Sequence, residues 1–153
     1  MGLFDKLFSS TTSTITYSPK SEQEAWIAVM YACIAADGDV SDAEIDKLCQ
    51  LVVYKSMFSG KEIIEYYKPA MIAHKQIGSK ALIDSSVSLI HENNKPTVFA
   101  LIMELLLADG ILGDKEKEIL EYLTESLKLA SDMAQKIVEV MLIKNNGNIV
   151  ILG

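Results

Sequence analysis

Apolar residues along this chain recur mainly at the three- and four-residue spacing that is typical of helices with one buried side. Two stretches are almost wholly apolar: AWIAVMYACIAA at positions 25–36 and VFALIMELLLA at positions 98–108. Glu104 interrupts the second stretch; we expect it at a helix edge, with a buried acid as the alternative. Strand-like alternation is absent outside the C-terminal tail. The pattern therefore predicts an all-α fold.

Capping residues and helix breakers divide the chain into about seven or eight helices. The first is expected to carry Pro19 in its first turn and to stop at Asp37-Gly38. Ser41 and Glu44 then form a capping box, in which each residue satisfies a backbone N–H of the other, and open the next helix.

The same logic predicts the helices that follow. Ser59 and Glu62 form a second capping box, and the helix behind it is expected to bend at Pro69. The tail, 145–153, is expected to dock as a turn and an extended segment. Further helices are predicted over 79–91, from Pro96 to Asp109-Gly110, over 114–127, and from a cap at Ser131 to about Lys144.

An internal repeat relates the two halves of the chain. The offset is 72 residues, the difference between Asp37 and Asp109. It predicts a pseudo-twofold bundle in which residues 24–74 superpose on 96–146. The pairs that share this offset are Asp37/Asp109, Gly38/Gly110, Asp42/Asp114, Glu44/Glu116, Leu48/Leu120, Leu51/Leu123 and Ser59/Ser131.

The acidic residues of the two turns admit two interpretations. As capping groups, carboxylates in the first turn of a helix are stabilised by its dipole. As ligands, they resemble the oxygen donors that Ca²⁺ prefers, although position 12 counted from Asp37 is Leu48, where an EF-hand has Glu. A hydrogen bond in the turn or an ion pair with a lysine would also account for Asp37. The candidate metal ligands are Asp37, Asp39, Asp42, Glu44, Asp109, Asp114 and Glu116.

The segments YACIAADGDVSDAEI and LLLADGILGDKEKEI resemble the paired acidic motifs of the TerB-like, tellurite-resistance family over about residues 21–144. The resemblance implies an all-helical, non-enzymatic domain in tellurite or chemical stress responses. It also implies acidic residues that bind a metal, and protein assemblies often linked to the inner membrane. The second copy departs from the pattern, because Ile111 and Gly113 stand where the first has Asp39 and Ser41.

Composition limits the possible partners of the chain, the state of its cysteines and its relation to a membrane. The net charge of −7 argues against a nucleic-acid partner and suits cations or a basic protein surface. Cys33 and Cys49 are expected to be free thiols in a reducing cytoplasm. The longest apolar run has twelve residues, fewer than the roughly 20 that span a bilayer. His74 and His91 are assigned to packing or surface.

The chain is divided into residues 1–18, a short amphipathic segment with a linker, and residues 19–153, a single helical domain. Leu3, Phe4, Leu7 and Phe8 share one helical face, which is expected to fold back onto the domain; a membrane or a partner is the alternative. Two functions are carried forward. One is a TerB-like stress protein that binds a divalent cation, and the other is a helical interaction module whose acidic turns only cap helices and contact a basic partner.

Overall fold

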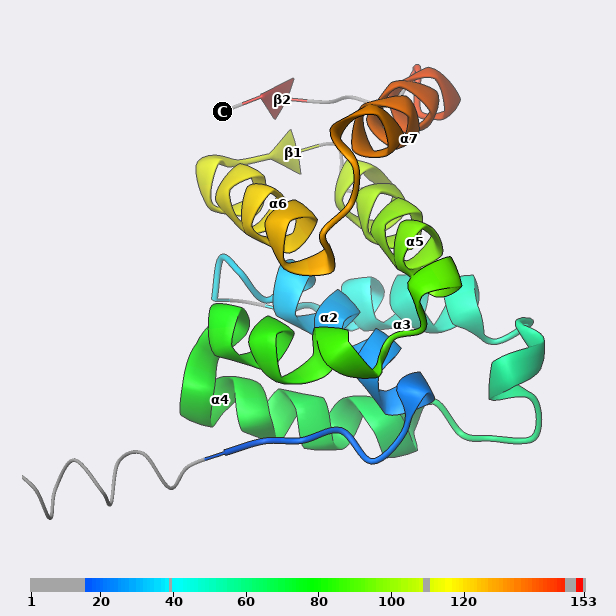
Figure 1. Cartoon of the computed structure of the whole chain (residues 1–153), viewed down its shortest axis with the longest axis vertical. Coiled ribbons are helices and arrows are strands. Elements are labelled where there is room, and N and C mark those ends of the chain that lie inside the picture. Colours follow the sequence, from blue (N-terminus) through cyan, green and yellow to red (C-terminus); the bar gives the residue numbers. More distant parts are fainter. Residues whose placement is uncertain (1–15, 39, 109–110, 148–150, 153) are drawn as a thin grey trace, which may run out of the picture.

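The computed structural model describes residues 16–38, 40–108, 111–147 and 151–152, which form a stack of helices (Figure 1). Three 3₁₀-helices, Ser56–Phe58, Val87–Leu89 and Glu92–Asn94, lie in the connections. The all-α prediction is confirmed, while the expected seven or eight helices are not reached within the described residues. The α-helices of these residues are α2 (Glu22–Ile34), α3 (Asp42–Val52), α4 (Ile64–Ser86), α5 (Lys95–Ala108), α6 (Asp114–Leu127) and α7 (Ser131–Lys144).

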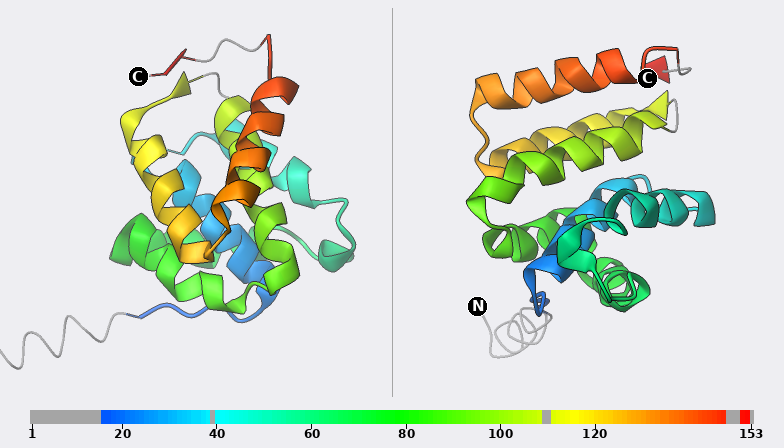
Figure 2. Two further views of the ribbon diagram at one scale, coloured as in Figure 1. Left: turned by 45° about the horizontal axis from the view of Figure 1, so that its top comes forward. Right: turned by 90° about the vertical axis from the view of Figure 1, so that its right-hand side faces the viewer.

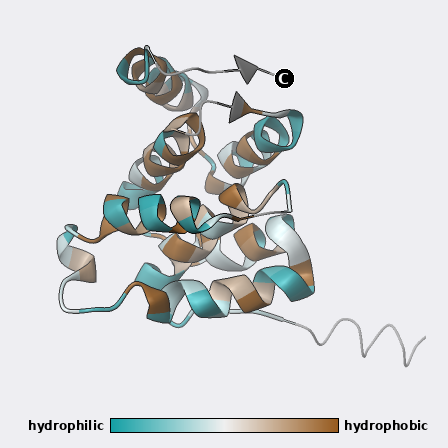
Figure 3. Cartoon of the chain, turned by 180° about the vertical axis from the view of Figure 1, so that it is seen from behind, coloured by the Kyte–Doolittle hydropathy of each residue, from teal (hydrophilic) through white to brown (hydrophobic). Residues whose placement is uncertain are grey.

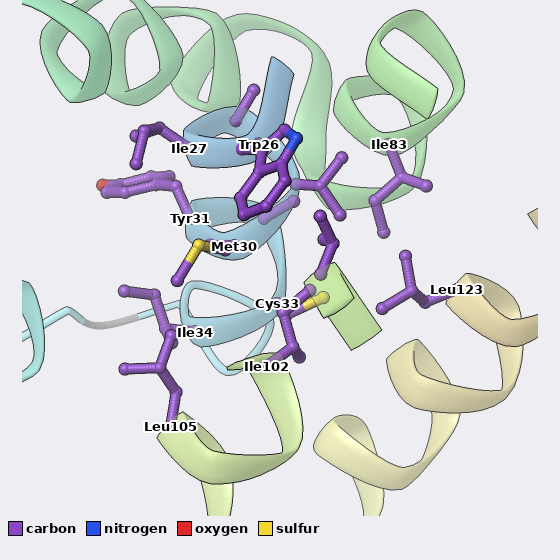
Figure 4. Packing of buried hydrophobic residues seen from close by; sticks show 14 of the residues in the cluster. Trp26, Ile27, Met30, Tyr31, Cys33, Ile34, Ile83, Ile102, Leu105 and Leu123 are labelled. Atoms are coloured by element: carbon purple, nitrogen blue, oxygen red, sulfur yellow. The ribbon is translucent and has the colours of Figure 1, made fainter. Parts of the chain in front are cut away.

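Helix α2 is the centre of the core. Every residue from Ala25 to Ala35 is at most 6 % exposed, so this helix is enclosed on all sides. Figure 4 shows its side chains projecting in several directions, toward α4, α5 and α6. None of the helices described is both long and apolar enough to cross a membrane.

The helices lie in three tiers (Figure 2). Helices α2, α3 and α4 form the lowest tier, α5 and α6 cover it, and α7 packs on α5 at the top. Hydrophobic segments gather where the helices face one another, and hydrophilic ones mark the outer turns of α6 (Figure 3). The amphipathic helices α3 and α6 thus help to cover the largely apolar α2 and α5.

Helix starts follow the predicted caps only in part. The N–H of Glu24 donates to Ser21 Oγ (3.1 Å), so α2 begins after Ser21, and Pro19 lies outside the helix, contrary to prediction. The capping box of Ser41 and Glu44 is confirmed at α3. Helix α7 begins at Ser131 with Ala130 as its N-cap, so Ser131 is the first helical residue and does not cap.

The second predicted capping box is wrong. Ser59 ends the 3₁₀-helix Ser56–Phe58, and α4 starts at Ile64 without a side-chain cap. The physical reason is the burial of Phe58, whose ring packs edge-to-face against Trp26 (6.0 Å) and Tyr66 (5.8 Å). Holding this ring in the core leaves Ser59 in the connection before the helix.

Helix α4 is kinked at Gly78 and not at Pro69. Gly78 has φ +82° and ψ 175°, a region that only glycine adopts readily. Pro69 keeps helical dihedral angles, because its fixed φ suits a helix and only one N–H is lost. The helices predicted on either side of residue 78 are therefore two halves of α4, which ends at Ser86 instead of His91.

The C-terminal tail docks as an extended segment, as expected. Strand β2 (Ile151–Leu152) pairs in parallel with β1 (Ile111–Leu112), which lies just before α6. Two segments about forty residues apart are thereby joined beside the second acidic turn. Residues 148–150 lie outside the described part of the chain.

Glu104 connects α5 with the end of α7. Its carboxylate accepts from Lys144 Nζ (2.8 Å) and from Asn145 Nδ2 (3.4 Å), and its side chain is 12 % exposed. Burial alone would raise the pKa of Glu104, but these two hydrogen bonds, together with the positive charges of Lys144 and Lys47, outweigh it and hold the pKa below its ordinary value. The acid expected at a helix edge is therefore a nearly buried, paired group.

We expect Glu104→Gln to lower the free energy of unfolding at pH 7 by about 1–2 kcal/mol, because Lys144 loses its charged partner. The folded-state pKa is depressed, so the stabilisation is fully present above the ordinary value of 4.5 and is lost as the pH falls from there through the lower folded-state pKa. Denaturant unfolding across this range should show wild type and variant converging in acid. Glu121→Gln, an exposed change on α6, is the matched control. A difference that persists in acid would contradict the assignment.

Candidate functional site

The first acidic turn, residues 35–44, carries the chain from α2 to α3. Ala35 is the C-cap of α2, and the N–H of Gly38 donates to its carbonyl (3.0 Å). Gly38 has φ +99°, so a residue with a Cβ would be strained where the chain reverses. The expected left-handed glycine is confirmed here, and its counterpart Gly110 lies outside the described residues.

Two of the candidate metal ligands cap helices. The N–H of Ser41 donates to Glu44 Oε1 (3.0 Å), and the N–H of Glu44 donates to Ser41 Oγ (3.2 Å). At the second turn the N–H of Gly113 donates to Glu116 Oε1 (3.5 Å), with no hydroxyl to return the bond. Glu44 and Glu116 therefore use carboxylate oxygens to satisfy the ends of α3 and α6.

The other candidate ligands are spread around the two turns. Asp42 and Asp114 are the first residues of their helices and are exposed, where the helix dipole stabilises negative charge. Asp37 is exposed on the first turn, and Asp39 and Asp109 lie outside the described residues. Within the described part of the chain, no three His, Cys, Asp or Glu side chains form a group that could hold a metal. Metal binding stays a prediction.

The end of the first acidic turn borders a cavity between α2, α3 and α4. Its volume is about 470 Å³. Asp42 and Asp46 are exposed beside it, whereas Tyr31 is buried and Tyr67 partly buried. We call it the tyrosine cavity; its lining residues are Tyr31, Val40, Asp42, Ile45, Asp46, Tyr67, Lys68 and Met71.

The beginning of the same turn borders a second cavity, at the kink of α4. This kink cavity has a volume of about 500 Å³ and joins the end of α2, residues 74–80 of α4 and the start of α6. It brings the first turn close to the helix that follows the second turn. Its polar lining residues are Asp37, His74, Ser79, Lys80, Lys115 and Glu118.

His74 is held in the wall of the kink cavity by two contacts. Its Nε2 lies 2.9 Å from Ser79 Oγ, and its ring packs edge-to-face on Tyr31 at 5.7 Å. Burial lowers the pKa of His74, which favours the neutral imidazole at pH 7. The histidine assigned to packing from the sequence thus also supplies a polar group to a cavity.

Lys80 of α4 and Glu118 of α6 form an ion pair at the kink cavity. Lys80 Nζ lies 2.9 Å from Glu118 Oε1 and 5.4 Å from the centroid of the Tyr122 ring. The hydrogen bond from Lys80 lowers the pKa of Glu118. Both side chains are more than half exposed, so the pair adds little to stability. It does hold α6 beside the second half of α4.

Sequence reasoning missed both cavities. An isolated glycine within a helical pattern weakens the helix by about 1 kcal/mol relative to alanine, and Gly78, between His74 and Ser79, is the local signal of a break in α4 beside the kink cavity. The tyrosine cavity has no comparable signal, because its two tyrosines lie 36 positions apart, at 31 and 67.

Comparison with protein-family models, curated proteins and solved structures finds no match for this chain. The resemblance to the TerB-like family therefore remains a prediction from the two acidic motifs.

The two predicted capping boxes allow a matched test. We expect Ser41→Ala to lower the free energy of unfolding by about 1 kcal/mol, because the N–H of Glu44 loses its acceptor. Ser59→Ala should change it by less than about 0.5 kcal/mol, because Ser59 does not cap α4. Urea unfolding of both variants measures the difference. Equal losses would show that the local sequence pattern, and not the observed geometry, decides capping.

Proposed function

We propose that this chain is a non-enzymatic helical binding module that docks a basic segment of a partner protein at its first acidic turn. The observation that carries the proposal is the tyrosine cavity, where two acids, Asp42 and Asp46, and one lysine, Lys68, lie beside apolar and aromatic side chains. The acidic net charge of −7 favours the approach of a positively charged surface. No residue is assigned a catalytic role.

The chemistry of a lysine or arginine side chain matches this cavity. Its apolar stem can pack on Tyr67 and Met71 while its charged end stays near Asp42 and Asp46. A cation close to a tyrosine ring gains a further electrostatic attraction. Because both aspartates are exposed, the charged pair would form without a large desolvation cost.

The kink cavity would extend the same binding surface. Asp37 and Gly38 line it at the beginning of the turn, as Val40 and Asp42 line the tyrosine cavity at its end. Lys115 gives the kink cavity a positive group as well. The lining of the kink cavity carries acidic and basic side chains. A peptide segment with both positive and negative groups therefore matches it better than a metal cation alone.

We expect a peptide that alternates lysine or arginine with apolar residues to bind the full chain. Asp42→Asn combined with Asp46→Asn should weaken its affinity by about tenfold or more at low salt, because both carboxylates beside the cavity are lost. Isothermal titration calorimetry measures the change, and raising the salt concentration should reduce it.

The matched control removes the same charge elsewhere. Glu121→Gln combined with Glu125→Gln changes two exposed acids of α6 that line neither cavity. Its affinity should stay close to that of the wild type. Equal losses in the two double variants would mean that the peptide responds to net charge alone, which contradicts a site at the turn.

Binding of a divalent cation at the first turn is the second candidate. Asp37 follows the C-terminal end of α2, where the helix dipole disfavours an anion, and its side chain is exposed. A cation near Asp37 would remove this unfavourable term. Carboxylates and backbone carbonyls of the turn would supply the oxygens that Ca²⁺ requires.

If this candidate holds, calcium raises the melting temperature of the wild type, because the ion binds only the folded chain. Asp37→Asn should abolish the increase. Scanning calorimetry of both proteins with and without calcium gives the four values. An unchanged wild type together with a destabilised variant would assign Asp37 to the turn itself.

We include membership of the TerB-like family in the proposed function. A TerB-like role in the stress response and a partner at the inner membrane rest on the two acidic motifs, and a cytoplasmic location rests on the two cysteines expected to be free thiols. The pseudo-twofold repeat is supported by the starts of α3 and α6, Asp42 and Asp114, which differ by the expected 72 positions. Packing adds support, because α3 contacts α5 while α6 contacts α2. Helices α4 and α7 follow the offset less closely.

A further inference from the structure

We propose that the N-terminal segment of this chain docks on its own domain, with Phe4 and Phe8 packed into a groove on the outer face of α4. The inference is independent of the function proposed above. The groove, called the entry groove, has a volume of about 480 Å³. Its walls include Thr16, Tyr17 and Ser18 from the entering chain and Pro69, Ile72 and Ala73 from α4.

Ile72 is the exposed apolar residue of this groove. It is 55 % exposed, whereas its neighbours Ala70 and Ala73 are buried against the core. Helix α4 therefore presents a large apolar side chain outward in its middle, next to Pro69. Covering such a side chain with another apolar group removes unfavourable contact with water.

The entering chain is fixed at the edge of the groove. The hydroxyl of Tyr17 donates to Glu24 Oε2 (2.6 Å), and Glu24 is itself only 5 % exposed. Tyr17 is thereby held against the start of α2, and Thr16 lies directly on the groove. The N-terminal segment is therefore attached to the domain at a residue that lines the groove, Thr16.

The length of the preceding chain limits where its apolar residues can go. Seven residues, 9–15, separate Phe8 from Thr16 and span at most about 25 Å when fully extended. The entry groove lies directly at this starting point, since Thr16 lines it. Tethering also raises the effective concentration of the segment at a nearby site.

A second exposed apolar surface exists on α7, but it is poorly placed for this segment. Met133, Val140 and Ile143 are 42–74 % exposed there. Figure 1 places α7 at one end of the long axis and the first described residues at the other. The short tether therefore favours the entry groove.

The composition of the segment suits the groove. Leu3, Phe4, Leu7 and Phe8 form one apolar face, and the groove is large enough to accept aromatic side chains. The segment carries one acid and one base, Asp5 and Lys6, and the groove is lined by two lysines and one glutamate, Lys20, Lys68 and Glu24. The choice of this groove therefore rests on its apolar residues and on the short tether.

A double-mutant cycle on the full chain tests the contact. If the segment is docked, Phe8→Ala and Ile72→Ala each lower the melting temperature by about 3 °C or more, and the double variant loses little beyond either single one. If Ile72 faces water, Ile72→Ala is neutral or stabilising, because alanine favours a helix. That result, or additive losses, would overturn the proposal.

Ile143→Ala is the matched control, since Ile143 is a more exposed isoleucine, at 74 %, on α7. Its effect should be independent of Phe8→Ala. Coupling of Phe8 to Ile143 in place of Ile72 would move the contact to α7 and contradict the proposal.

Two further measurements test the alternative partners of the segment, a second copy of the chain and a lipid surface. Coupling that is unchanged on hundredfold dilution supports docking within one chain, whereas coupling that disappears assigns the contact to a second copy. Flotation with anionic phospholipid vesicles tests a lipid surface. Vesicle binding that needs Phe8, in a chain without coupling to Ile72, would assign the segment to a membrane and overturn the proposal.

Discussion

The complete burial of α2 is the constraint on which the rest of the structure depends. A helix with no polar side from Ala25 to Ala35 is stable only if other elements remove its whole circumference from water. Helices α4, α5 and α6 share this task. Each large apolar side chain buried in this way contributes about 1.5–3 kcal/mol, so the enclosure of α2 is a large favourable term in folding.

A helix enclosed in this way must satisfy its polar ends where it meets water. At the start, Ser21 accepts from the backbone, and Glu22 accepts from Trp26 Nε1, the N–H of His91 and Asn94 Nδ2 at 2.7–3.1 Å. At the other end Gly38 reverses the chain into the acidic turn. The change from an apolar helix to a group of carboxylates therefore marks the point where the chain leaves the core.

Helix α4, one of the helices that cover α2, is not straight. It runs from Ile64 to Ser86 and is kinked at Gly78. The kink leaves a cavity where α2 ends and α6 begins. The surfaces on which both the binding function and the docking of the N-terminal segment are proposed thus arise from how α4 meets α2, and they involve side chains that contribute little to the core.

The sequence by itself determined the features that depend on local chemistry. The apolar runs predicted the two buried helices, and the Ser41 capping box and the bounds of α6 were predicted correctly, because periodicity and capping act within a few residues. The tertiary structure decided the rest. Ser59 has the same capping pattern as Ser41, but burial of Phe58 against Trp26 and Tyr66 places it outside the helix.

The candidate site also has some features that the sequence predicted and others that only the tertiary structure decided. The acidic residues and their association with helix starts were visible in the sequence, whereas neither cavity was, because Tyr31 and Tyr67 meet only when α4 packs on α2. Pairing of β2 with β1 and of Glu104 with Lys144 likewise joins residues about forty positions apart. Local patterns specify which segments form helices, but contacts between distant residues depend on how the apolar faces pack, and that packing is a property of the whole chain.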